Sequence, residues 1–178
     1  MYSFIIDYTL TEAEDIVEPV TVEEAKQYCR VTNDVEEWLF VQLITQSRQA
    51  IEKATGLSLV PKDCVLWFTN YNGDTQLPYG PVQEFKKLYN EKNEEITPPF
   101  YTLIGAQYPT LLNPRWANLK ATYSCGFEND KCPSELKIAM LDQINYGYEN
   151  RGMDVNDMGI CEKTWRVCQR WTKTSPIL

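Results

Sequence analysis

The chain is 178 residues long, 43% of its residues are apolar, and its formal net charge is −8. This size and apolar content suffice for one ordinary domain with its own core, and no stretch approaches the ~20 apolar residues that a membrane span needs. The sequence contains no histidine, which excludes the Ser-His-Asp arrangement and most zinc chemistry. We therefore predict a soluble protein that is not an enzyme and has no metal or cofactor site.

Acidic and basic residues are separated along the chain. Residues 1–60 carry eleven acids and four bases, whereas residues 161–178 carry one acid and four bases. A broadly acidic body repels phosphate backbones, so tight sequence-independent binding to nucleic acid is not expected. Adjacent glutamates recur at 23–24, 36–37 and 94–95. Helix-dipole compensation and solubility explain these pairs better than carboxylate catalysis does.

Six cysteines occur without a CxxC motif or a preceding signal peptide: Cys29, Cys64, Cys125, Cys132, Cys161 and Cys168. This usage predicts reduced thiols in a cytosolic compartment, with a disulfide formed by later oxidation as the alternative. Cys161 and Cys168 are seven residues apart, which on a helix separates them by about 10 Å. That spacing is too long for one metal ion, so a core or interface position is expected.

Residues 1–18 begin with alternating apolar and aromatic residues and then become acidic. This pattern favours an edge strand or an arm that lies on a neighbouring subunit. The alternative is a solvated leader with a short strand.

Residues 19–56 predict a short helix, a turn and a long helix. Thr21 and Glu24 form a capping box at the first helix, and Asn33 with Glu36 repeats the arrangement at the second. The long helix has one apolar stripe at three- and four-residue steps and ends at Gly56. Helices joined by so short a turn pack against each other, and this pair is the expected framework.

The middle of the chain predicts a small antiparallel sheet. Apolar runs or alternating patterns mark strands at 64–68, 82–89, 100–104 and 119–125, and residues 90–95 form a charged hairpin tip. A third helix follows, with Pro133 in its first turn and its end at 150–152. No internal repeat is present.

The last residues combine tryptophans with arginines: Trp165, Arg166, Arg170 and Trp171. Tryptophan and arginine are enriched at the energetic centres of protein interfaces, which favours docking onto a partner protein or a neighbouring subunit. Two alternatives remain, a last amphipathic helix on the subunit's own core and stacking with single-stranded nucleic acid.

The predicted fold class is α+β, mainly α, with a helical hairpin, a third helix, a small antiparallel β-sheet insertion and extended termini. The predicted divisions are an N-terminal arm at residues 1–18, a central domain at 19–152 and a C-terminal tail at 153–178.

Five segments in this order resemble the head-to-tail connector family, the head-completion adaptors that dock beneath the portal of tailed phages. They are PVTVEEAKQYCRV from Pro19, ATGL from Ala54, the LPYGPV segment from Leu77, ATYSCGF from Ala121, and CPSELKIA from Cys132 leading to YENR at residues 148–151. The N-terminal extension, the long 90–118 region and the cysteine- and tryptophan-containing tail depart from the family pattern.

The resemblance implies a virion structural protein in the neck, at the head-tail interface, assembled in the host cytoplasm. It implies a homo-oligomeric ring, commonly a dodecamer, that binds the portal and other neck or tail proteins and lets double-stranded DNA pass without specific binding. No membrane partner is expected. We assign ring packing to helix residues Trp38, Phe40, Arg48 and Arg151. Contact with the portal or a neighbouring subunit is assigned to the tryptophan and arginine set of the tail, Trp165, Arg166, Arg170 and Trp171. The alternatives are a DNA-packaging accessory that binds nucleic acid and another neck or tail-completion protein.

Overall fold

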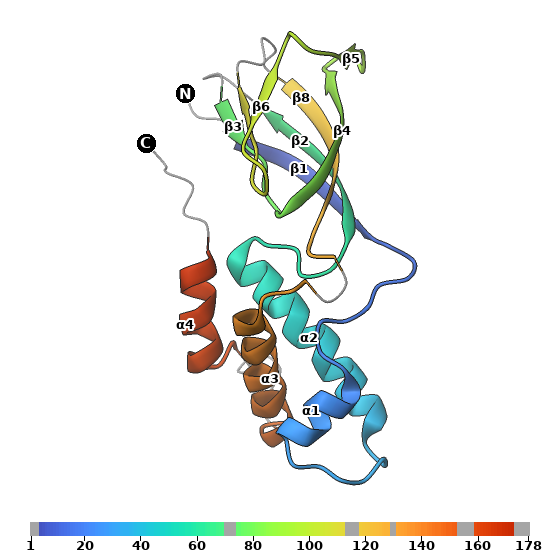
Figure 1. Cartoon of the computed structure of the whole chain (residues 1–178), viewed down its shortest axis with the longest axis vertical. Coiled ribbons are helices and arrows are strands. Elements are labelled where there is room, and N and C mark those ends of the chain that lie inside the picture. The colour runs from blue at the N-terminus through green and yellow to red at the C-terminus, as the bar shows by residue number, and fades with distance from the viewer. Residues whose placement is uncertain (1–3, 70–73, 113–117, 129–130, 153–158, 173–178) are drawn as a thin grey trace. The chain divides into compact units, whose positions relative to one another are not determined.

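The computed structural model describes residues 4–69, 74–112, 118–128, 131–152 and 159–172 (Figure 1). The chain forms two compact units. The sheet unit comprises residues 1–16 and 60–127, and the helical unit comprises residues 17–59 and 128–178. Each unit is therefore built from two separate stretches of sequence.

The larger sheet of the sheet unit has five antiparallel strands in the order β1-β2-β8-β4-β5. These strands are β1 (Phe4–Glu12), β2 (Lys62–Thr69), β4 (Val82–Asn90), β5 (Glu95–Ile96) and β8 (Asn118–Cys125). The central strand β8 buries Leu119, Ala121, Tyr123 and Cys125 in strict alternation, as a strand with one core face requires. The predicted edge strand near the N-terminus is thus present as β1, paired with β2 alone.

A second sheet has the order β3-β7-β6, formed by β3 (Asp74–Gln76), β6 (Thr102–Ile104) and β7 (Thr110–Leu112). Leu77 and Leu111, from in and around this sheet, lie in one apolar cluster with Leu66 and Leu88 of the five-stranded sheet. The Tyr123 hydroxyl donates to the Pro78 carbonyl oxygen at 2.8 Å, which satisfies the polar tip of a fully buried ring.

Gly126 directly follows β8, at a position where the backbone conformation and a close backbone contact require glycine. Its φ is +106°, and a Cβ built there would lie 2.0 Å from the Val60 carbonyl oxygen. Its amide donates to the Pro81 carbonyl oxygen at 2.8 Å. The three chain segments therefore meet backbone to backbone.

The helical unit begins with α1 (Val22–Tyr28) and α2 (Glu37–Thr55). The predicted capping box is confirmed, because the Thr21 hydroxyl accepts from the Glu24 amide at 3.1 Å and the Glu24 carboxylate accepts from the Thr21 amide at 2.8 Å. The second predicted cap is wrong. Asn33 instead accepts from the Val35 amide within a turn, and α2 starts at Glu37 without a side-chain cap. Gly56 ends α2 in the left-handed conformation, as predicted.

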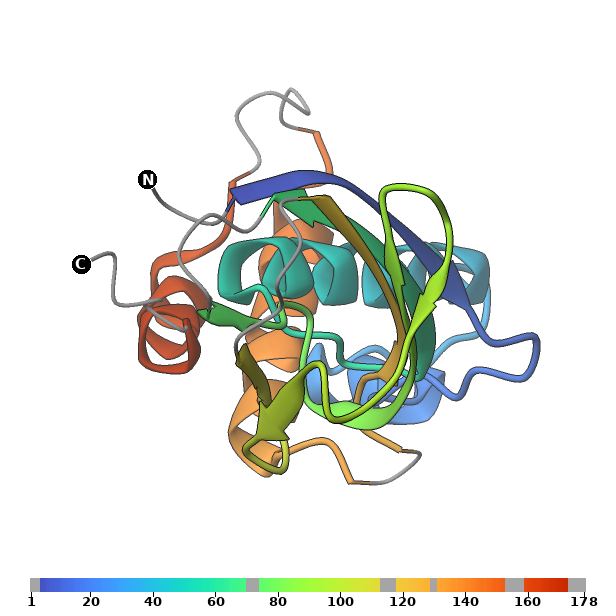
Figure 2. The ribbon, with the colours of Figure 1, turned by 90° about the horizontal axis from the view of Figure 1, so that it is seen from above.

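Two further helices complete this unit, α3 (Ser134–Glu149) and α4 (Glu162–Trp171). Helix α3 follows Pro133 as predicted and packs on α2, where Gly147 allows contact with Leu43, since a Cβ there would lie 2.9 Å from the Leu43 Cδ2. Helix α1 lies against α2 and α3 on one side, and α4 lies against the same two helices on the other (Figures 1 and 2).

The predicted class of a mainly α fold is wrong. Helices account for 34% of the described residues and strands for 29%, and the strands form two antiparallel sheets. Two properties of the sequence hid this balance. Strands β3, β5, β6 and β7 have two or three residues each, too few to show a period. Strand β1 finds its partner some fifty residues away, a pairing that local patterns do not reveal. The predicted domain divisions stay a prediction.

Candidate functional site

Three apolar side chains stand in solvent at the start of α2. Val35 is 81% exposed, Trp38 is 68% exposed and Val41 is 48% exposed. Val35 lies in the turn before the helix, and Trp38 and Val41 follow at three-residue steps, so they share one side of α2. We call this set the Trp38 ridge. Adjacent exposed apolar side chains of this size are typical of an interaction surface.

The turn that carries the ridge is fixed to the end of α3. The Tyr148 hydroxyl donates to the Glu36 carboxylate at 2.7 Å, and the Tyr148 ring stacks on Phe40 with 5.0 Å between centroids. Arg151 lies over the same ring at 4.5 Å and reaches Glu36 at 3.8 Å. Of the predicted ring-packing residues, Trp38 and Arg151 are therefore exposed at this corner, whereas Phe40 is buried beneath it.

Arg48, the fourth predicted ring-packing residue, is 1% exposed inside the helical unit. Its Nε donates to Glu18 at 2.9 Å and its Nη1 donates to Glu52 at 3.3 Å. Glu52 also accepts from the Leu59 amide at 2.8 Å. This ion network joins α2 to the chain segments that enter and leave the helical unit, so Arg48 supports the site from within.

Helix α4 carries the predicted tryptophan and arginine set on two faces. Arg170 Nε donates to Glu135 of α3 at 3.0 Å, and the Trp171 indole N–H donates to the other oxygen of Glu135 at 2.8 Å. These bonds from Arg170 and then Trp171 lower the pKa of the Glu135 carboxyl. Thr164 and Cys168 are the buried residues of α4. Arg170 and Trp171 thus fasten α4 to its own subunit.

The other half of the set faces outward. Trp165 is 46% exposed, and the Arg166 side chain is 69% exposed and pairs with Glu162 on the same helix. Glu162, Trp165, Arg166 and Gln169 recur at three- and four-residue steps, which places them on one side of α4. We call this set the Trp165 face.

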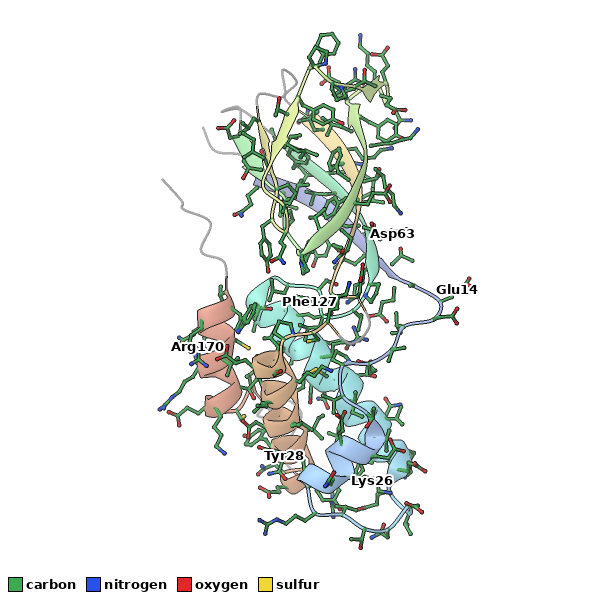
Figure 3. All side chains as sticks on the ribbon, viewed as in Figure 1. Glu14, Lys26, Tyr28, Asp63, Phe127 and Arg170 are labelled. Atoms are coloured by element: carbon green, nitrogen blue, oxygen red, sulfur yellow. The ribbon has the colours of Figure 1, made fainter. Side chains whose placement is uncertain are left out.

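The two surfaces lie on opposite sides of the helical unit. Figure 3 labels Arg170 on α4 and Lys26 on α1, with α3 between them, and the view from above in Figure 2 agrees. Lys26 pairs with Asp34 in the turn before α2, which places the turn on the α1 side. Two different interaction surfaces on opposite sides of a subunit allow heterologous contacts, in which one surface of each copy binds the other surface of the next.

Comparison with solved structures gives similar chains over nearly the whole length. One, in a structure titled "Neck of empty GTA particle computed with C6 symmetry", matches with a TM-score of 0.70 and 17% identity, covering 93% of this chain and 95% of that one. This chain has the fold of that particle chain. A chain of the "Virion of native gene transfer agent (GTA) particle" matches with a TM-score of 0.63, 19% identity and coverage of 92% and 95%.

A third chain, from the "Neck of native GTA particle computed with C12 symmetry", matches with a TM-score of 0.61, 18% identity and coverage of 93% and 95%. No protein-family model and no curated protein matches the sequence. The matches cover 92–93% of this chain, so the shared fold includes both the sheet unit and the helical unit.

The sheet unit of this shared fold has an apolar edge of its own. Ile5 is 45% exposed, Ile6 is 55% exposed and Tyr8 is 48% exposed on β1, and the register with β2 shifts between Ile5 and Asp7. A bulge of this kind interrupts the backbone hydrogen-bond pattern of the edge strand, which disfavours nonspecific pairing with a strand of another chain. Sequence reasoning had not selected these residues or Val35. The sequence does contain a signal for Val35, because an apolar residue stands within the acidic turn Asn33-Asp34-Val35-Glu36.

Four of the six thiols lie in environments that suppress nucleophilic chemistry. Burial raises the pKa of four of them to about 11: Cys29, Cys64, Cys132 and Cys168. Because the thiolate is the reactive form, these groups are almost fully protonated at neutral pH. Among the described residues there is no cluster of three or more potential metal ligands.

Each unit has a hollow on its described surface. The hollow in the sheet unit has a volume of about 270 Å³ and includes Trp67, Glu91 and Lys120 in its lining, and the hollow in the helical unit has a volume of about 390 Å³ and includes Lys53. Neither lining holds the two carboxyl groups that glycoside hydrolysis requires. No helix within the described ranges is long and apolar enough to cross a bilayer.

Proposed function

We propose that this chain is a structural subunit of the neck of a phage-like particle, where copies form a ring beneath the portal. In this role it is the head-to-tail adaptor: the ring extends the DNA channel and provides the platform for tail attachment. The protein acts by fitting together with its partners, and no chemical step is involved.

The observation that carries the proposal is the TM-score of 0.70 over 93% of this chain and 95% of a chain from a particle neck. The likeness spans the helical unit and the sheet unit, so an ordinary helical hairpin does not account for it. The five sequence segments that resemble the connector family support the same role independently, because they come from residues rather than from shape.

Cyclic symmetry is the second element of the proposal. Structures that contain similar chains are titled with C6 and C12 symmetry, and we propose a closed homo-oligomeric ring, with twelve copies, for this protein. A ring requires each subunit to present one surface to the neighbour on one side and a different surface to the neighbour on the other. The Trp38 ridge and the Trp165 face are two such surfaces.

The remaining partners follow from the position of such a ring. The portal lies above it, other neck or tail proteins lie below, and double-stranded DNA passes through the opening. The excess of acids over bases in residues 1–60 disfavours adhesion of phosphates to the wall. The ring assembles in the host cytoplasm, where the buried thiols stay reduced, and its final place is the neck of the virion.

Electron microscopy of the purified protein, alone and mixed with its portal, tests this function. The expected result is a ring that stacks coaxially on the portal. A DNA-packaging accessory would instead bind duplex DNA with an affinity that falls steeply with salt. Binding of that kind near 150 mM salt, together with the absence of rings, would refute the adaptor role.

A further inference from the structure

The Trp38 ridge is an unusually exposed apolar surface for a soluble subunit. Its three side chains, Val35, Trp38 and Val41, are between 48% and 81% exposed. The ridge is also held rigidly, because Phe40 and Tyr148 stack beneath it and Glu36 accepts from the Tyr148 hydroxyl. A rigid apolar surface binds a partner without a large ordering cost.

The charges around the ridge define what its partner must carry. Residues 33–41 contain three acids, Asp34, Glu36 and Glu37, and no base. Lys26 pairs with Asp34 and Arg151 lies 3.8 Å from Glu36, so two of the three acids have a basic neighbour within the subunit. A complementary partner therefore has an apolar centre with a basic side chain beside it that can meet Glu37.

The Trp165 face has this composition. Arg166 is the base of this face, whereas Lys163 and Arg170 of the same helix pair with Asp142 and Glu135 of α3. Trp165 is 46% exposed at the centre, and the side chain of Arg166 beside it is 69% exposed. Both surfaces belong to the helical unit, and the elements that carry them, the turn before α2 and helix α4, lie on its opposite sides (Figure 2). One subunit therefore cannot bring its own ridge and its own face together.

We propose that the Trp38 ridge of one subunit binds the Trp165 face of the next copy of this chain. The proposal rests on the ring described under the proposed function and assigns the residues that join its neighbours. The tryptophans supply the apolar area that the contact buries, which is limited to the exposed parts of the two side chains, 68% of Trp38 and 46% of Trp165. The charges set the direction and register of the contact, since exposed ion pairs contribute little affinity. Portal docking is then left to surfaces other than Trp165.

Charge exchange tests this pairing in the full-length protein. Glu37→Arg and Arg166→Glu are made singly and together, and ring formation is followed by sedimentation and electron microscopy. Each single variant is expected to raise the protein concentration for half-assembly about tenfold, and the double variant to return it to within about twofold of wild type. Every interface of the double variant again has opposite charges.

Matched variants separate this contact from general effects. Trp38→Ala is expected to raise the half-assembly concentration about thirtyfold, as at an interface hot spot. Ile138→Ala, a change at a 54% exposed residue of α3, is expected to leave it unchanged. Glu37→Arg combined with Lys53→Glu, at the other end of α2, is expected to give no rescue. Circular dichroism verifies that each variant is folded.

The outcomes are distinguishable from those that test the proposed function. If wild-type rings form and bind the portal but the charge-exchanged double variant is no better than the single variants, the pairing is wrong and the adaptor role stands. Assembly of Trp38→Ala at the wild-type concentration also overturns the pairing. If wild-type protein forms no ring with or without the portal, both proposals fail.

Discussion

Replacing Arg48 by alanine removes the guanidinium that joins Glu18 and Glu52 in the core of the helical unit. Arg48 is 1% exposed, its bond to Glu18 measures 2.9 Å, and its bond to Glu52 measures 3.3 Å. The variant leaves two carboxylates without this partner and also removes the packing of the arginine stem. Breaking a buried ion pair in this way costs about 3–5 kcal/mol.

The burial of each carboxylate decides how that cost is divided. The Glu52 side chain is 10% exposed, whereas that of Glu18 is 23% exposed. Water therefore stabilises Glu18 better after the change, and Glu18→Gln alone should cost about 1 kcal/mol. Glu52→Gln should cost more, because the residue both faces Arg48 and accepts from the Leu59 amide at 2.8 Å.

Denaturant unfolding followed by far-ultraviolet circular dichroism measures these effects. For a chain of this size a loss of about 3–5 kcal/mol lowers Tm by about 6–20 °C. Arg48→Met combined with Glu52→Gln should recover about 1–2 kcal/mol relative to Arg48→Ala, because a neutral buried group replaces a stranded charge. Lys53→Met, on the exposed side of the same helix, should change stability by less than about 0.5 kcal/mol. A loss below about 1 kcal/mol for Arg48→Ala would refute this account of the core.

Three further predictions concern other parts of the chain. Bonds from Arg170 and Trp171 lower the pKa of Glu135 in the folded protein. They therefore stabilise the packing of α4 above the ordinary glutamate pKa of 4.5, and this stabilisation is lost as the pH falls through the lowered pKa of Glu135. Tryptophan fluorescence should follow the loss, and Glu135→Gln should abolish its pH dependence. The four thiols with a pKa of about 11, of which Cys29 is only partly buried, ionise from pH 9 only when the chain is unfolded. The free energy of unfolding should therefore fall between pH 9 and 11, and a serine variant of Cys64 should show a shallower fall. A pH-independent free energy of unfolding in that range would contradict the raised pKa values. Gly126→Ala forces a Cβ toward the Val60 carbonyl oxygen at a φ of +106°, so it should destabilise the sheet unit by at least about 2 kcal/mol. The control Gly152→Ala, whose Cβ meets no atom within 4 Å, should be nearly neutral. Equal Tm values for the two variants would contradict this prediction.

Local signals in the sequence were sufficient for elements whose boundaries depend on nearby residues. Thr21 and Glu24 cap α1 through bonds between positions three apart, and Gly56 ends α2 because it can adopt a positive φ. The alternation in 119–125 predicted β8 correctly, because one face of that strand is buried along its length. In these cases the residues that decide the structure are neighbours in sequence.

Elements that depend on distant residues were predicted less well. The start of α2 is held by Tyr148 on α3, more than a hundred residues away, so Asn33 and Glu36 do not act as the expected cap. The burial of Arg48 depends on Glu18 and on the Leu59 amide, and no helical period indicates it. For the tail, the sequence identified Trp165 and Trp171 together, but only the partner of Trp171 on α3 shows that the two side chains serve different purposes.

Imaging of the neck of the intact virion at residue resolution tests the central claim most directly. The account predicts a closed ring of copies of this chain directly beneath the portal, with the helical units side by side around the DNA channel. Density for this fold elsewhere in the particle, or a neck without such a ring, would contradict it.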